Sequence, residues 1–122
     1  MKVMCQISFG EFIDKITILT IKLKRIDDPK KLFHIKEELD KLKTTYNGEC
    51  DDLLNELIQV NENLWVIEDL LRFMEKQKKF NDRFISLARS VYRLNDKRFE
   101  IKNNINKKFD SEFMEQKSYE DY

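Results

Sequence analysis

The sequence predicts an all-α fold, an up-and-down antiparallel bundle of about four helices with a short extended N-terminal lead-in. Lys, Glu, Leu, Ile and Asn dominate the chain, and only two Gly and one Pro interrupt its 122 residues. This composition favours long helices over strands and tight turns. Apolar residues also recur three and four positions apart along four segments that are joined by short connections. Such segments are typical of antiparallel neighbours in a bundle.

The start of the chain carries clear local signals. Val3, Cys5 and Ile7 alternate with polar or flexible residues, which predicts the extended lead-in. Ser8, followed three positions later by Glu11, predicts a capping box at the first turn of a helix. This helix is expected to end near Asp27, because Pro29 disfavours helix at the residue before it.

The remaining helices are delimited by caps and turn residues. We expect the second helix between Asp28 and the Asn-Gly pair at 47–48, the third between the Asp-Asp pair at 51–52 and Lys79, and the fourth between 81–82 and about Phe109. The apolar residues of the third helix form a heptad-like seam. Together these elements predict one domain over residues 1–122, with a polar and aromatic tail at 110–122 that either packs on the bundle or is disordered.

The sequence lacks the residues that characterise several classes of protein. No run of residues resembles a signal peptide or a membrane span, so we expect a cytoplasmic protein with no membrane partner. His34 is the only histidine, which leaves neither a zinc site nor a Ser-His-Asp triad, and no Gly-rich loop follows a strand. The carboxylates at 27–28 and 51–52 are interpreted as helix caps rather than metal ligands, so no metal and no cofactor are predicted.

The charge of the chain is zero overall but unevenly distributed. Residues 72–108 contain twelve Lys or Arg against four Asp or Glu, a net charge of +8, and the rest of the chain is acidic. This asymmetry indicates either an anion-binding face or an ordinary solvated surface. Nucleic acid is an unlikely partner, because no basic-aromatic motif accompanies the charge.

Arg98 is the strongest sequence indication of a site. It falls within the apolar stripe of the fourth helix, where a guanidinium is costly to bury unless it is paired or meets an anion. Asn95 and Lys102 lie on the same side of that helix. Glu68 of the third helix is the expected counter-ion. Two interpretations stay open: an anion-binding site, or an ion pair that only fixes helix register.

Two further surfaces mix charged and apolar or aromatic residues. Tyr92, with Arg89 beside it on the fourth helix, could hold a sugar, a base or a phosphate. The outer face of the first helix is expected to be covered by another helix or a partner, to surround a pocket with Glu11 or Asp14 as general base, or to carry plain surface ion pairs. That face contains Glu11, Asp14, Lys15, Ile18, Ile21, Lys22 and Arg25.

Four stretches carry a resemblance to a family of small, functionally uncharacterised proteins and C-terminal domains of bacteria and large DNA viruses. They are SFGEFIDKITILTIK at 8–22, NLWVIEDLLR at 63–72, FISLARSVYRLNDKR at 84–98 and KSYEDY at 117–122. Thr20 departs from the glutamate expected there. The resemblance highlights Glu11, Asp14, Lys15, Lys22, Glu68, Arg89, Tyr92, Asn95, Arg98, Lys117, Ser118 and Tyr119. It also implies an association with glycosyltransferases and polysaccharide biosynthesis.

Three hypotheses about function follow. The leading one is a binding module for an anionic, sugar-linked or phosphorylated ligand, or for a glycosyltransferase-type partner. The residues expected to bind it are Lys22, Arg89, Tyr92, Asn95, Arg98, Lys102, Lys117, Ser118 and Tyr119. The second is a small enzyme of sugar metabolism with Glu11, Asp14, Lys15 or Glu68 in acid, base or charge-stabilising roles. The third is a structural homo-oligomer that buries Ile18, Ile21 and Trp65 between copies.

Overall fold

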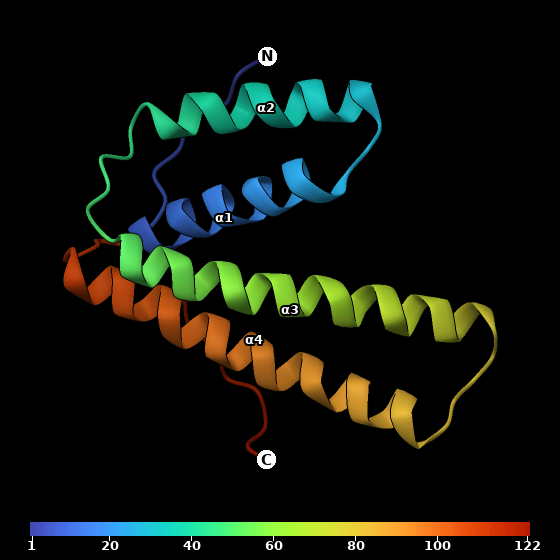
Figure 1. The fold of residues 1–122 in the computed structure, drawn as a ribbon. Coiled ribbons are helices and arrows are strands. Elements are labelled where there is room, and N and C mark those ends of the chain that lie inside the picture. The colour runs from blue at the N-terminus through green and yellow to red at the C-terminus, as the bar shows by residue number, and fades with distance from the viewer.

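A computed structural model describes all 122 residues as four helices joined by short loops (Figure 1). The helices are α1 (Phe9–Arg25), α2 (Pro29–Lys43), α3 (Asp51–Lys76) and α4 (Asp82–Lys108). Successive helices run in opposite directions, and no residue is assigned to a strand. The predicted all-α bundle is therefore confirmed. None of the four helices combines the length and the apolar character that crossing a membrane would need.

Helix α1 is the central helix of the bundle. It packs against each of the other three helices, α3 and α4 pack along each other, and α2 contacts no helix other than α1. The core forms where α1 crosses the α3 and α4 pair. It comprises Ile13, Ile16, Leu19, Leu39, Cys50, Leu57, Val60, Ile101 and Ile105. Because α1 is covered on more than one side, two stripes of its surface are buried.

Three of the predicted helix caps are confirmed. The Ser8 side chain accepts a hydrogen bond from the backbone N–H of Glu11 at 3.1 Å, Asp28 caps α2, and Asn81 caps α4. Each side-chain oxygen satisfies a backbone donor that the helix itself leaves without a partner. The capping box is only half formed, however, because the Glu11 carboxylate pairs with Lys102 instead of turning back to Ser8.

Helix α3 begins within the predicted Asp-Asp pair, but its predicted cap and its end need correction. Cys50 is its N-cap and forms no side-chain capping bond, so Asp51 and Asp52 occupy the first turn instead. The Asp51 carboxylate accepts a 2.7 Å hydrogen bond from the Tyr46 hydroxyl, which closes the loop between α2 and α3. At the other end α3 stops at Lys76 rather than Lys79, and Lys78 takes a left-handed backbone conformation with φ of 56°.

The far ends of α3 and α4 extend beyond the end of α1 (Figure 1). Near these ends, Phe73 of α3 and Ile85 of α4 are more than half exposed.

The C-terminal tail folds back along α4. Residues 109–122 leave the end of the helix, run beside it and stay outside any helix or strand (Figure 1). Of the two alternatives that the sequence left open, the structure has the packed one, and its contacts contribute to the site described next.

Candidate functional site

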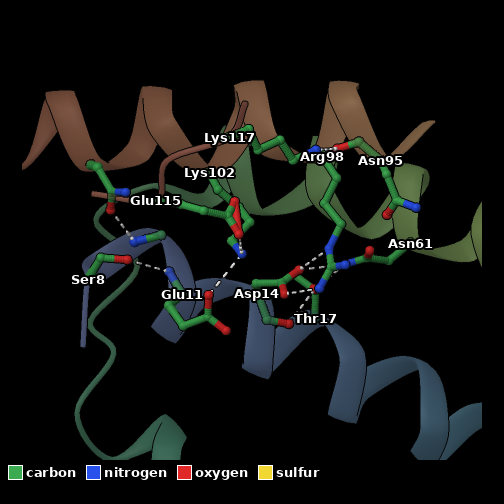
Figure 2. A network of polar contacts seen from close by, with 12 residues as sticks. Ser8, Glu11, Asp14, Thr17, Asn61, Asn95, Arg98, Lys102, Glu115 and Lys117 are labelled. Carbon is green, nitrogen blue, oxygen red and sulfur yellow. Dashed lines mark hydrogen bonds and ion pairs between the residues drawn. The ribbon is translucent and has the colours of Figure 1, made fainter. Parts of the chain in front are cut away.

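A buried carboxylate on α1 joins three helices. Asp14 is 1% exposed, and its Oδ1 accepts hydrogen bonds from Asn61 Nδ2 of α3 at 2.9 Å and from Arg98 Nε of α4 at 3.1 Å (Figure 2). Arg98 Nη2 donates to the second carboxylate oxygen. Asn61 Nδ2 also donates to the Thr17 hydroxyl at 2.8 Å. We call these four residues the Asp14 network.

The Arg98 side chain lies between the helices and is paired there with a carboxylate, as expected. The hydrogen bonds and charge of Asp14 raise the pKa of its guanidinium, against the opposing effect of burial. The two hydrogen bonds from Arg98 to the two Asp14 oxygens hold the guanidinium plane in a fixed orientation. Only 29% of the side chain is exposed, and Nη1 has no hydrogen-bond partner in the protein. Arg98 therefore retains donors that another group could use.

The predicted counter-ion of Arg98 was wrong. Glu68 pairs with Arg72 one turn along α3, at 3.4 Å, and Asp14 of α1 takes the place expected for it. The prediction that Asp14 lies on an outer face of α1 was also wrong. This face is covered by α3 and α4, so both Asp14 and Ile21 are buried. Covering by another helix was one of the alternatives drawn from the sequence.

The sequence does contain a signal for the buried face of α1 that carries Asp14 and Ile21. Gly10, Asp14, Thr17 and Ile21 are spaced four, three and four residues apart, and all four are buried. This is the helical period that the apolar stripe of α1 also follows. Small and polar residues at that spacing indicate a close helix contact with buried hydrogen bonds.

A second ion pair, in which only the ammonium is buried, lies one turn away. Lys102 is 4% exposed, and its Nζ lies 2.9 Å from Glu11 Oε2 of α1 and 3.3 Å from Glu115 Oε1 of the tail (Figure 2). An ammonium at this depth needs such partners, because an unpaired charge is costly to bury. Lys102 therefore links α4 to α1 and to the tail.

The N-terminus of α1 is occupied by the protein's own groups. Phe9 N–H donates to the Ser111 hydroxyl at 2.8 Å, and Gly10 N–H donates to Asn106 Oδ1 at 2.7 Å. Glu11 and Phe12 N–H groups donate to the Ser8 side chain and backbone. With its first four donors satisfied, this helix end offers no free N–H group to an anion.

The tail is fixed to α4 by Lys117 and Tyr122. Lys117 Nζ donates to the Asn95 carbonyl at 3.3 Å and lies 3.4 Å from Asp96 Oδ1. The Tyr122 hydroxyl donates to Asp96 Oδ2 at 2.6 Å, and its ring lies against Tyr92 with centroids 4.9 Å apart. Charged and aromatic contacts thus hold both ends of the KSYEDY segment.

A cleft of about 440 Å³ opens between α4 and this tail. We call it the tail cleft. It is lined by Val91, Tyr92, Asn95, Asp96, Arg98, Phe99, Lys102, Glu115, Lys117 and Tyr119. Three cations and three aromatic rings therefore face one space. Lys117 Nζ also lies 4.9 Å from the centre of the Phe99 ring and 5.7 Å from that of Tyr119, both within the range of cation-π attraction.

Six of the nine residues predicted to bind a ligand line the tail cleft. They are Tyr92, Asn95, Arg98, Lys102, Lys117 and Tyr119. The other three, Lys22, Arg89 and Ser118, are not among its lining residues. Arg89 nevertheless influences a residue of the cleft. Hydrogen bonding from Arg89, and then from Arg93, lowers the pKa of the Tyr92 hydroxyl.

The four residues proposed as catalytic do not converge. Asp14 is paired with Arg98, and Glu11 is paired with Lys102. Lys15 instead pairs with Glu38 of α2 at 3.5 Å, where both side chains are about half exposed. Glu68 is occupied by Arg72. No group of three or more His, Cys, Asp and Glu side chains is placed to hold a metal ion.

Asp96 gives a pH test of tail docking. The Tyr122 hydroxyl and then Lys117 lower the pKa of its carboxyl group. A lowered pKa in the docked state means that this contribution to docking is complete above the ordinary aspartate pKa and is lost as the pH falls through the lowered value. We expect Tyr122→Phe to raise the Asp96 pKa toward its ordinary value, as measured by NMR titration of the carboxyl carbon.

Tyr119→Phe is the matched control for that titration. Tyr119 belongs to the same segment, yet its hydroxyl has no hydrogen bond to Asp96. Its removal should leave the Asp96 titration unchanged. Equal shifts in the two variants would show that the Tyr122 hydroxyl does not bind this carboxylate in solution.

Fold and site together define a small helical protein in which a buried network of ion pairs positions a cationic, aromatic cleft. The chain belongs to DUF6165, a family of unknown function, which matches residues 1–122. The resemblance inferred from the four sequence stretches is thereby confirmed as far as an uncharacterised family is concerned. No curated protein and no solved structure matches the chain.

Proposed function

We propose that the protein is a binding module for an anionic, sugar-linked or phosphorylated ligand, which it holds in the tail cleft. The observation that carries this proposal is the convergence of Arg98, Lys102 and Lys117 with three aromatic rings around one space. Cations supply charge-assisted hydrogen bonds to phosphate or carboxylate oxygens. Tyr92 and Tyr119 are exposed and offer ring faces for a base or a sugar.

The ligand must compete with carboxylates of the protein itself. Glu115 already contacts Lys102, and Asp96 contacts Lys117, so each ammonium has an internal partner. Glu115 and Asp96 are both more than a third exposed, which makes these pairs weak in water. A phosphate group with several oxygens and a larger charge can replace one of these carboxylates. That carboxylate then acts as a placeholder for the ligand.

The geometry favours binding over catalysis. Asp14 is held by three hydrogen bonds, and neither Asp14 nor Glu11 lines the tail cleft. A general base needs to reach the proton that it removes. The tail cleft contains Asp96 and Glu115, but both accept bonds that fix the tail. These groups serve to shape and close the cleft.

A glycosyltransferase-type enzyme is the partner that fits this role. The resemblance of the sequence stretches to proteins associated with polysaccharide biosynthesis supports it. A module that holds a sugar-linked anion would keep that ligand close to an enzyme that consumes it.

Binding of inorganic phosphate and of a uridine diphosphate hexose tests the proposal. We expect both to shift amide signals of α4 and the tail in NMR titrations, and we expect Lys117→Gln to weaken binding about 10-fold, the effect of losing one charged hydrogen bond. Lys97→Gln removes the same charge from α4, outside the cleft. Equal weakening by the two variants, or no shifts in the cleft, would refute the proposed site.

A further inference from the structure

We propose that a second cleft, on the other side of Arg98, binds a hexose ring, and that this ring is the sugar part of the ligand. The inference rests on the proposed function and deepens it. The cleft measures about 400 Å³ and lies between α1 and α3, where Arg98 reaches in from α4. We call it the Trp65 cleft. Its volume falls within the range of about 300 to 1,000 Å³ of small-molecule sites.

The apolar part of the Trp65 cleft suits the flat side of a sugar ring. Ile18 and Ile21 of α1 and Leu64 and Trp65 of α3 contribute to its lining. Ile21 is almost fully buried, whereas Trp65 is only partly buried, so the indole is available at the surface. A pyranose presents C–H groups on its faces, and an aromatic ring is the surface on which such a face stacks.

The polar part suits the rim of hydroxyl groups. Glu68, Asp69 and Arg72 line one wall, and Asn61 and Arg98 line the cleft beside the Asp14 network. A hydroxyl group both donates and accepts, so it matches carboxylates as acceptors, guanidinium groups as donors and an amide as either. An aromatic platform surrounded by planar polar side chains is therefore complementary to a polyhydroxyl ring.

The balance of charges separates this cleft from the tail cleft. Glu68 and Asp69 offset the two arginines here, whereas cations outnumber carboxylates in the tail cleft, so a phosphate group is favoured there. A lipid chain would leave those carboxylates and guanidinium groups without partners, at a cost. A neutral, hydroxyl-rich ring avoids that cost. The two clefts therefore divide the chemistry of a sugar-linked anion between them.

Arg98 connects the two clefts. It is the only residue that lines both, and its orientation is fixed by the two bonds to Asp14. The free Nη1 donors are thus held at the boundary between the expected positions of the anion and of the ring. A rigid donor shared by two parts of one ligand favours simultaneous binding of both, because no further side-chain entropy is lost.

Trp65 provides a direct test, because it is the only tryptophan in the chain. We expect the methyl glycosides of glucose, galactose or mannose to change its fluorescence saturably in at least one case. Glu68→Gln should weaken that binding about 5-fold or more, as expected when an acceptor for a hydroxyl group is impaired. Glu75→Gln is the matched control, since Glu75 lies on the same helix outside the cleft and pairs with Lys78.

Phosphate titrations of the same samples separate this inference from the proposed function. Glycoside binding without phosphate binding would support the Trp65 cleft and refute the anion site. Phosphate binding with no response to any of the three glycosides would overturn the inference alone. Dimer formation in light scattering, with a Trp65 signal that depends on protein concentration and not on glycosides, would overturn it in favour of a second copy in the cleft.

Discussion

Gly10→Ala is expected to lower the free energy of unfolding by about 3 to 5 kcal/mol. A Cβ atom on Gly10 would lie 2.4 Å from the Lys102 carbonyl oxygen and 2.9 Å from Asn106 Oδ1. The carbonyl belongs to the α4 backbone and cannot rotate away, so the two helices must separate. Separation would also break the 2.7 Å bond from Gly10 N–H to Asn106. Urea denaturation followed by far-ultraviolet circular dichroism measures the change.

Gly48→Ala is the control for this effect. Gly48 has a φ of 79° and only Asp51 side-chain atoms, at 3.5 Å or more, near the added methyl group. Its replacement should cost about 1 to 2 kcal/mol, from backbone strain alone. If Gly10→Ala costs no more than Gly48→Ala, the helices are not in close contact at Gly10.

Asp14→Ala is expected to destabilise the protein by about 3 kcal/mol, because it leaves the largely buried Arg98 guanidinium without a counter-ion. Removing Arg98 as well should recover part of this loss. The double variant Asp14→Ala with Arg98→Ala is therefore expected to cost about 2 kcal/mol less than the sum of the single changes. Denaturation of the four proteins of this cycle gives the coupling energy.

The exposed ion pair of Lys15 and Glu38 is the matched control for burial. Both of its side chains are about half exposed, and Glu38→Ala should cost less than about 1 kcal/mol. Additive effects of the Asp14 and Arg98 changes would contradict the buried pair. So would an Asp14→Ala cost as small as that of Glu38→Ala.

The helices could be predicted because their signals are local. Ser8, Asp28 and Asn81 lie where short-range capping geometry puts them, and apolar residues at helical spacing mark the seam between α3 and α4. A cap depends on residues within one turn of itself. The boundary of α3 was missed by a few residues, since Lys78 enters a left-handed conformation that no local signal announces.

The charge on α4 was also recognised correctly, but its partner was not. That Arg98 needs a counter-ion follows from the position of a charged residue within an apolar stripe. Which carboxylate satisfies it depends on how α1 crosses α3 and α4, and this crossing sets Asp14 rather than Glu68 opposite the guanidinium. The way in which α1 crosses α3 and α4 depends on packing between helices that are far apart in the sequence.

The sequence by itself determined the helical class of this protein, most of its helix limits and the residue types from which a polar site could be built. Only the tertiary structure decided that Asp14 is buried, that the tail closes a cleft with Lys117, and that Trp65 and Arg98 line one space. The physical reason is the range of the interactions. Helix formation is set by neighbours within a few residues, whereas ion pairing, burial and clefts arise from segments brought together by packing.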